Sequence, residues 1–93
     1  MGFTVIIDKE VKKKELPNLR SAHLHKKFET LMTVLREDPF QSPPEFEELK
    51  GELKGYNSRR LNIQHRLVYR VDKEKKEVTI VSAWTHDYHK IRR

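Results

Sequence analysis

Two short β-strand patterns separated by a tight turn constrain this chain more than any other feature. Residues 56–62 and 65–71 carry the aromatic and aliphatic side chains of strands, and 62–64 supplies the turn. Between Lys54 and Arg70 there is no acidic residue, and this segment carries five cations: Lys54, Arg59, Arg60, Arg66 and Arg70. Because successive side chains on a strand point to opposite faces, a sheet displays such cations in set directions and can hold a phosphate-bearing chain.

Length and composition predict one small domain, residues 1–93, with a heavily charged surface. Of the 93 residues, 35% are hydrophobic and 37% charged, so the core must be thin. Lys and Arg number 20 against 14 for Asp and Glu, and the resulting net charge of +6 favours polyanionic or acidic partners. The chain has no cysteine, which excludes disulfides and cysteine-based zinc sites. Because the apolar run Phe3–Ile7 is too short for a signal peptide or a membrane span, we expect a cytoplasmic protein without a membrane partner.

The N-terminal half is predicted to form one strand and two helices. Phe3–Ile7 is a β-branched strand pattern, and a polar helix from Lys9 to Glu15 follows it, ending at Pro17. A second helix is predicted between Pro17 and Pro39. Its apolar residues fall at i, i+4, i+7, i+8 and i+11, a one-sided stripe made of Leu24, Phe28, Leu31, Met32 and Leu35.

The C-terminal half is predicted to form a small sheet. The proline-rich segment Asp38–Phe46 is a loop, and Glu45–Glu52 is either a short helical turn or an edge segment. Three strands are expected, with Asp72–Glu77 as a solvated hairpin tip: Tyr56–Asn62, His65–Val71 and Val78–Trp84. The order β-α-α-β-β-β indicates an α+β domain whose helices pack on one face of a small, mainly antiparallel sheet. The other face is then free to be polar and functional.

A base, a cation and an acid are expected near that open face. Arg66 shares a strand face with Val68 and Arg70 and can serve as a functional cation there. The alternative interpretation is that Arg66 only forms a structural ion pair with a neighbouring glutamate. His86 follows the last strand and can transfer a proton near neutral pH, although it is also compatible with an ordinary surface histidine. A general base can come from the one concentrated group of acids near the basic strands: Glu45, Glu47, Glu48 and Glu52.

The sequence predicts no metal site and no cofactor. His23 and His25 stand two apart on a helix and therefore point away from each other, which makes a poor metal site. The three glycines are scattered and form no phosphate-binding loop, and no serine-hydrolase motif occurs.

Four segments together resemble a known family. Residues 47–50 (EELK), 53–56 (LKGY), 58–61 (SRRL) and 65–69 (HRLVY) are followed by a C-terminal strand with His86 and Tyr88. In order and spacing they are similar to the YoeB/Txe branch of the RelE/ParE superfamily, the RelE-type toxins of bacterial type II toxin–antitoxin systems. The resemblance covers roughly Glu45–Tyr88 and implies a RelE-like fold over the single domain, with 88–93 as a tail.

The resemblance implies a ribosome-dependent endoribonuclease. Such toxins cleave mRNA in the A site of the 70S ribosome without a metal or other cofactor, and thereby inhibit translation. A small acidic antitoxin of the YefM/Phd-like type is the implied protein partner. Both a monomer and a homodimer are compatible with this resemblance.

Residue roles follow from the matching positions. Glu47 matches the general base, although a shift of one residue would place Glu48 there. Arg66 matches the arginine that stabilises charge on the phosphate, His86 the general acid, and Tyr88 the tyrosine that orients the scissile nucleotide. The remaining cations are implied to bind RNA backbone: Lys54, Arg59, Arg60 and Arg70.

Two other functions stay open. One is a ParE-like toxin of the same fold that acts on a protein target such as DNA gyrase. The other is a non-catalytic RNA-binding or protein-binding module that uses the same basic sheet. For such a module, replacement of His86 would leave function intact, whereas replacement of Arg59 and Arg60 would abolish it.

Overall fold

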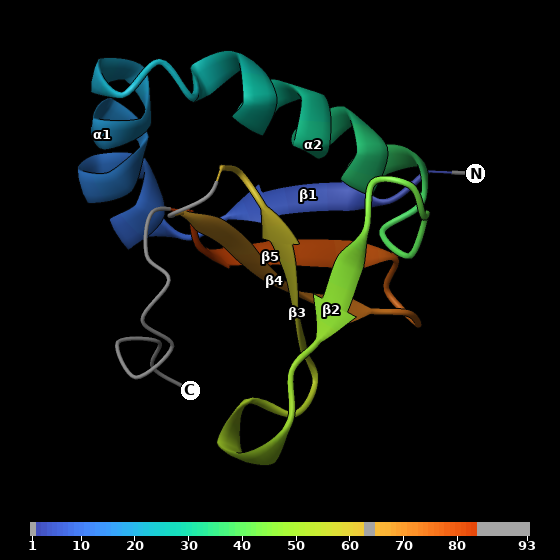
Figure 1. Cartoon of the computed structure of the whole chain (residues 1–93). Coiled ribbons are helices and arrows are strands. Elements are labelled where there is room, and N and C mark those ends of the chain that lie inside the picture. Colours follow the sequence, from blue (N-terminus) through green and yellow to red (C-terminus); the bar gives the residue numbers. More distant parts are fainter. Residues whose placement is uncertain (1, 63–64, 84–93) are drawn as a thin grey trace.

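A five-stranded sheet with helices on one face forms the part of the chain that the structure, a computed structural model, describes: residues 2–62 and 65–83 (Figure 1). The spatial order of the strands is β1-β5-β4-β3-β2. β1 pairs in parallel with β5, and the other neighbours are antiparallel. The strands are β1 (Thr4–Ile7), β2 (Phe46–Glu48), β3 (Tyr56–Arg60), β4 (Arg66–Asp72) and β5 (Glu77–Ser82).

The first helical segment extends further than predicted. A π-helical turn, η1 (Val11–Glu15), leads directly into α1 (Leu16–Ser21), so the chain stays helical past Pro17. Proline is tolerated there because it stands in the first turn of α1, where a missing N–H breaks no helical hydrogen bond.

The longer helix, α2 (His25–Glu37), confirms the apolar stripe. Four of the five predicted stripe residues lie in the helix and are buried, namely Phe28, Leu31, Met32 and Leu35. The fifth, Leu24, immediately precedes the helix and packs partly buried against the same core. No helix among residues 2–62 and 65–83 is long and apolar enough to cross a membrane.

The predicted C-terminal strands are present, and one more strand joins them. β3, β4 and β5 fall within the predicted ranges to within a residue or two at each end. The segment for which two alternatives stood open contains both, an edge strand β2 and a 3₁₀ turn η2 (Gly51–Leu53). Gly55, whose φ of +99° favours glycine, ends the connection from η2 to β3.

The two faces of the sheet differ in what covers them. The main core lies between helices and sheet, and from β4 and β5 it takes Leu67, Tyr69, Val78 and Ile80. A much smaller apolar cluster of Leu49, Tyr56 and Val68 lies on the other face, with Leu53 and Val81 against it. The predicted alternation along β4 is therefore confirmed. In Figure 1 both helices lie above the sheet, and no element of residues 2–62 and 65–83 covers the second face, which is called the open face below.

Candidate active site on the open face of the sheet

The register of three neighbouring strands brings the predicted base and the predicted cation to the open face. Glu47 on β2 pairs with Ser58 on β3, and Ser58 pairs with Val68 on β4. Because Val68 belongs to the open-face cluster, this cross-strand row lies on that face. Arg66, two residues before Val68, has the same orientation and pairs with Arg60.

Glu47 and Arg66 reach toward each other across β3. A guanidinium nitrogen of Arg66 lies 4.0 Å from a carboxylate oxygen of Glu47, and the two side chains are 30% and 63% exposed. An exposed ion pair at this separation contributes little to stability, so both groups are available to a ligand. The arrangement offers a proton acceptor next to a fixed positive charge.

The neighbouring Glu48 has the opposite orientation. It pairs with Asn57, which is in phase with the buried Tyr69 on the helix-covered face. Adjacent residues on a strand cannot share a face, so only one of the two glutamates lies on the same face as Arg66. Of the two carboxylates considered as the base, the geometry favours Glu47.

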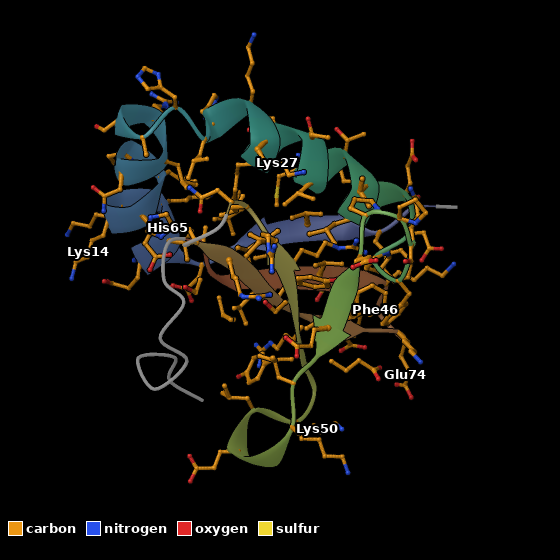
Figure 2. All side chains as sticks on the ribbon, in the orientation of Figure 1. Lys14, Lys27, Phe46, Lys50, His65 and Glu74 are labelled. Atoms are coloured by element: carbon orange, nitrogen blue, oxygen red, sulfur yellow. The ribbon has the colours of Figure 1, made fainter. Side chains whose placement is uncertain are left out.

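Three of the predicted RNA-binding cations are exposed. Arg60 and Arg70 lie at opposite ends of the β3–β4 ladder on the open face, and Lys54 stands in the connection before β3. Figure 2 labels Lys50 in the same β2–β3 connection, at the end of the sheet away from Phe46. Of these cations, Arg60 is the cross-strand partner of Arg66, and Arg70 lies on the same face of β4 as Arg66.

Arg59 does not lie on this surface. Its side chain is 1% exposed, and its guanidinium donates hydrogen bonds to the carbonyl oxygens of Pro39 (3.0 Å), Gln41 (2.9 Å) and Pro44. Its Nε also donates to the Tyr69 hydroxyl at 3.1 Å. The expectation of a surface cation that contacts RNA backbone is not met, because Arg59 points toward the helix-covered face and closes the loop after α2.

Aromatic rings complete the surroundings of Arg59. Its guanidinium carbon lies 4.9 Å from the centre of the Phe46 ring and 5.9 Å from that of Tyr69. Burial raises the pKa of the Tyr69 phenol above its usual 10.0, and the nearby Arg59 cation offsets part of this shift. The phenol stays protonated and donates to the Pro39 carbonyl at 2.9 Å. Arg59 thus ties the 39–44 loop to β3 and β4, beside the strand that carries Glu47.

The interior role of Arg59 was missed in the sequence, although alternation along β3 contains a signal for it. Arg59 and Arg60 are adjacent, so they cannot both lie on the open face. A second contact, between the Glu15 carboxylate and the Ala83 N–H, joins residues 68 positions apart and has no local signal in the sequence.

Two of the predicted site residues, His86 and Tyr88, lie outside the described residues. Within the described ranges, no group of three or more His, Cys, Asp or Glu side chains is placed to hold a metal ion.

Comparison with solved structures defines the class of protein. The fold matches a YoeB/ParE toxin from Agrobacterium tumefaciens with a TM-score of 0.76 and 26% identity, over 90% of this chain and 99% of that one. The toxin–antitoxin complex YoeB–YefM from Staphylococcus aureus gives a TM-score of 0.73 and 27% identity, over 92% and 99%. The predicted α+β, RelE-like fold is confirmed.

Sequence comparison then defines the family. The family model described as the YoeB-like toxin of bacterial type II toxin–antitoxin systems matches residues 18–88. The Toxin YoeB of Mycobacterium bovis is 45% identical over 56 residues, which are 60% of this chain and 64% of that protein. The chain thus aligns with a little under two thirds of the length of this relative. The chain belongs to the YoeB-like toxin family.

Proposed function

We propose that this protein is a toxin that cleaves mRNA in the ribosomal A site and is neutralised by a cognate antitoxin. The observation that carries the proposal is the Glu47–Arg66 pair on the open face of the sheet, in a chain of the YoeB-like family. The Staphylococcus aureus relative forms a complex with the antitoxin YefM, which supports an acidic antitoxin as the partner of this basic chain.

The proposed reaction is a transesterification within the RNA. Glu47 accepts the proton of a ribose 2′-hydroxyl, whose oxygen attacks the adjacent phosphorus. Arg66 stabilises the negative charge that builds on the phosphate oxygens. The bond to the 5′-oxygen breaks, His86 protonates that oxygen, and the products are a 2′,3′-cyclic phosphate and a 5′-hydroxyl.

Other residues of the proposed site bind rather than react. Tyr88 orients the scissile nucleotide, and Lys54, Arg60 and Arg70 contact the RNA backbone of messenger or ribosome. The exposure of these three cations on one side of the sheet supports this part of the proposal.

A translation reaction with the purified protein, followed by primer extension on the mRNA, tests the function. Wild-type protein should produce cuts at codons in the A site, and Arg66→Ala should remove them. Arg20→Ala is the matched control, since it removes an exposed arginine from α1 in the helical layer, and its cuts should persist. Arrested translation with intact mRNA would instead indicate a protein target and contradict the nuclease.

His86→Gln tests the proposed acid separately. It should slow cleavage by about two to four orders of magnitude, since general acid catalysis contributes that much, with little change in ribosome binding. Equal losses of binding and cleavage would contradict the assignment of His86 as the acid.

A further inference from the structure

A carboxylate of the first helical segment holds the end of the last described strand. Glu15, the final residue of η1, accepts a hydrogen bond from the N–H of Ala83 with a nitrogen–oxygen distance of 2.6 Å. Ala83 directly follows β5, so its N–H lies beyond the last paired residue of the strand, Ser82. A hydrogen bond from a backbone N–H to an ionised carboxylate is charge-assisted and stronger than one between neutral groups. The contact connects the N-terminal helical layer with the start of the C-terminal segment.

Glu15 lies at the end of a local irregularity of the helix. η1 is a π-helical turn in which the N–H of Leu16 bonds to the carbonyl of Val11. Such a turn contains one residue more than an α-helical turn, and π-turns are frequent at functional sites. Val11 and Leu16, five residues apart, both pack against the main core, and Glu15 between them reaches the end of β5.

A second irregularity in β5 directs Ala83 toward Glu15. Tyr69 pairs with Ile80, but the preceding Val68 pairs with Ser82, so β5 contains one extra residue at this point. Strict alternation would place Ile80 and Ala83 on opposite faces, whereas both belong to the main core. β-bulges of this kind redirect the side chains that follow them.

The end of a strand does not by itself require a charged acceptor for its last N–H. Burial raises the pKa of the Glu15 carboxyl, partly offset by the Ala83 N–H, so holding a carboxylate here is unfavourable in itself. Water or a neutral side chain would satisfy a single N–H at lower cost. A charged acceptor supplied by a separate element instead fixes the place at which the chain leaves the sheet.

We infer that Glu15 is a positioning residue for the acid of the cleavage reaction. His86 comes three residues after Ala83 in the sequence, and three residues span at most about 10 Å. Displacement of the Ala83 backbone therefore displaces the point from which the chain continues to His86. Misplacement of a catalytic group by about 1 Å is enough to slow catalysis about 100-fold. This inference rests on the proposed function.

Cleavage kinetics on programmed ribosomes test the inference. Glu15→Ala should lower kcat by about 10- to 100-fold and leave KM within about twofold, because ribosome-contacting residues are untouched. Glu15→Gln keeps an oxygen acceptor and should retain most of the rate. The control is Glu10→Ala, which removes an exposed carboxylate one helical turn earlier and should leave both constants unchanged.

A double-mutant cycle with His86→Gln separates positioning from general destabilisation. If Glu15 acts through His86, Glu15→Ala should change the residual rate of the His86→Gln protein by less than about twofold. Losses of cleavage rate that multiply in the double variant, or a normal kcat for Glu15→Ala, would overturn this inference. The proposed function would still stand if the wild-type protein cleaved mRNA and this cleavage depended on Arg66. Wild-type protein that leaves mRNA intact would overturn both.

Discussion

At the scale of single residues, Arg59 shows how a cation can serve the fold instead of a ligand. Its guanidinium is nearly inaccessible, and its partners are carbonyl oxygens, a phenol and two rings. Among the described residues, none of these partners is a carboxylate. Several carbonyls converge on one planar fork of donors, which a lysine ammonium cannot reproduce. Arg59 therefore determines where the proline-rich loop joins the sheet.

Replacement of Arg59 should be strongly destabilising. Arg59→Met should lower the free energy of unfolding by about 3 kcal/mol, because buried carbonyls and the Tyr69 hydroxyl lose their donor. Arg59→Lys should recover only part of this loss. Urea unfolding measures the effect, and Arg60→Met is the control, since this adjacent arginine is exposed and should change stability by no more than about 0.5 kcal/mol. Equal effects at the two positions would contradict a structural role for Arg59.

At the scale of elements, contacts between segments distant in the chain set the geometry of the site. β2 has only three residues, and the Arg59–Phe46 contact together with the 39–44 loop holds it beside β3. η1 holds the end of β5 through Glu15. Short edge elements gain their order from such tertiary contacts because they form few hydrogen bonds of their own.

The η1–β5 contact predicts a pH dependence of stability. The pKa of Glu15 in the folded protein lies above its ordinary 4.5, so the folded state binds this proton more tightly than the unfolded state. The stability contributed by Glu15 is then fully present below 4.5 and declines as pH rises through the folded-state value. The Glu15→Gln protein should gain stability relative to wild type between about pH 4 and about pH 7 in urea unfolding. A constant or opposite difference would contradict the pKa direction, and Glu10→Gln provides the exposed control.

At the scale of the whole molecule, the layered architecture separates the helix-covered face of the sheet from the face on which we propose that RNA binds. Helices cover one face of the sheet (Figure 1), and the register of the strands places the Glu47–Arg66 pair on the other. Lysines also occur on the outside of the helical layer, where Figure 2 shows Lys14 extending away from the sheet. The net charge of +6 therefore does not by itself locate the proposed RNA-binding surface.

The salt dependence of ribosome binding distinguishes these surfaces. Binding should weaken steeply with added salt, because each phosphate contact releases counterions. Arg60→Gln and Arg70→Gln should each reduce the slope of log affinity against log salt by about 1. Lys12→Gln on η1 should leave the slope unchanged. A flat response, or an equal change for Lys12→Gln, would place the RNA-binding surface elsewhere than the open face.

Local patterns in the sequence determined which segments are helices, which are strands, and most of their bounds. The stripe of α2 and the alternation of β4 each express a hydrophobic period that depends on neighbours within a few residues. The family motif likewise predicted Glu47 and Arg66 as residues of one site, and the structure brings their side chains to 4.0 Å from each other. Such features are readable because the residues that cause them are close in the chain.

Only the tertiary structure decided which cations are surface groups and where the strand ends are held. Arg59 and Arg60 have the same chemistry in the sequence, and they differ because one face of β3 is covered by the loop that Arg59 itself binds. Pro17 did not end its helical segment, because it stands in the first turn of α1, which follows the π-turn directly. The Glu15–Ala83 contact joins distant residues, and its partners become neighbours only when the helical layer packs on the sheet.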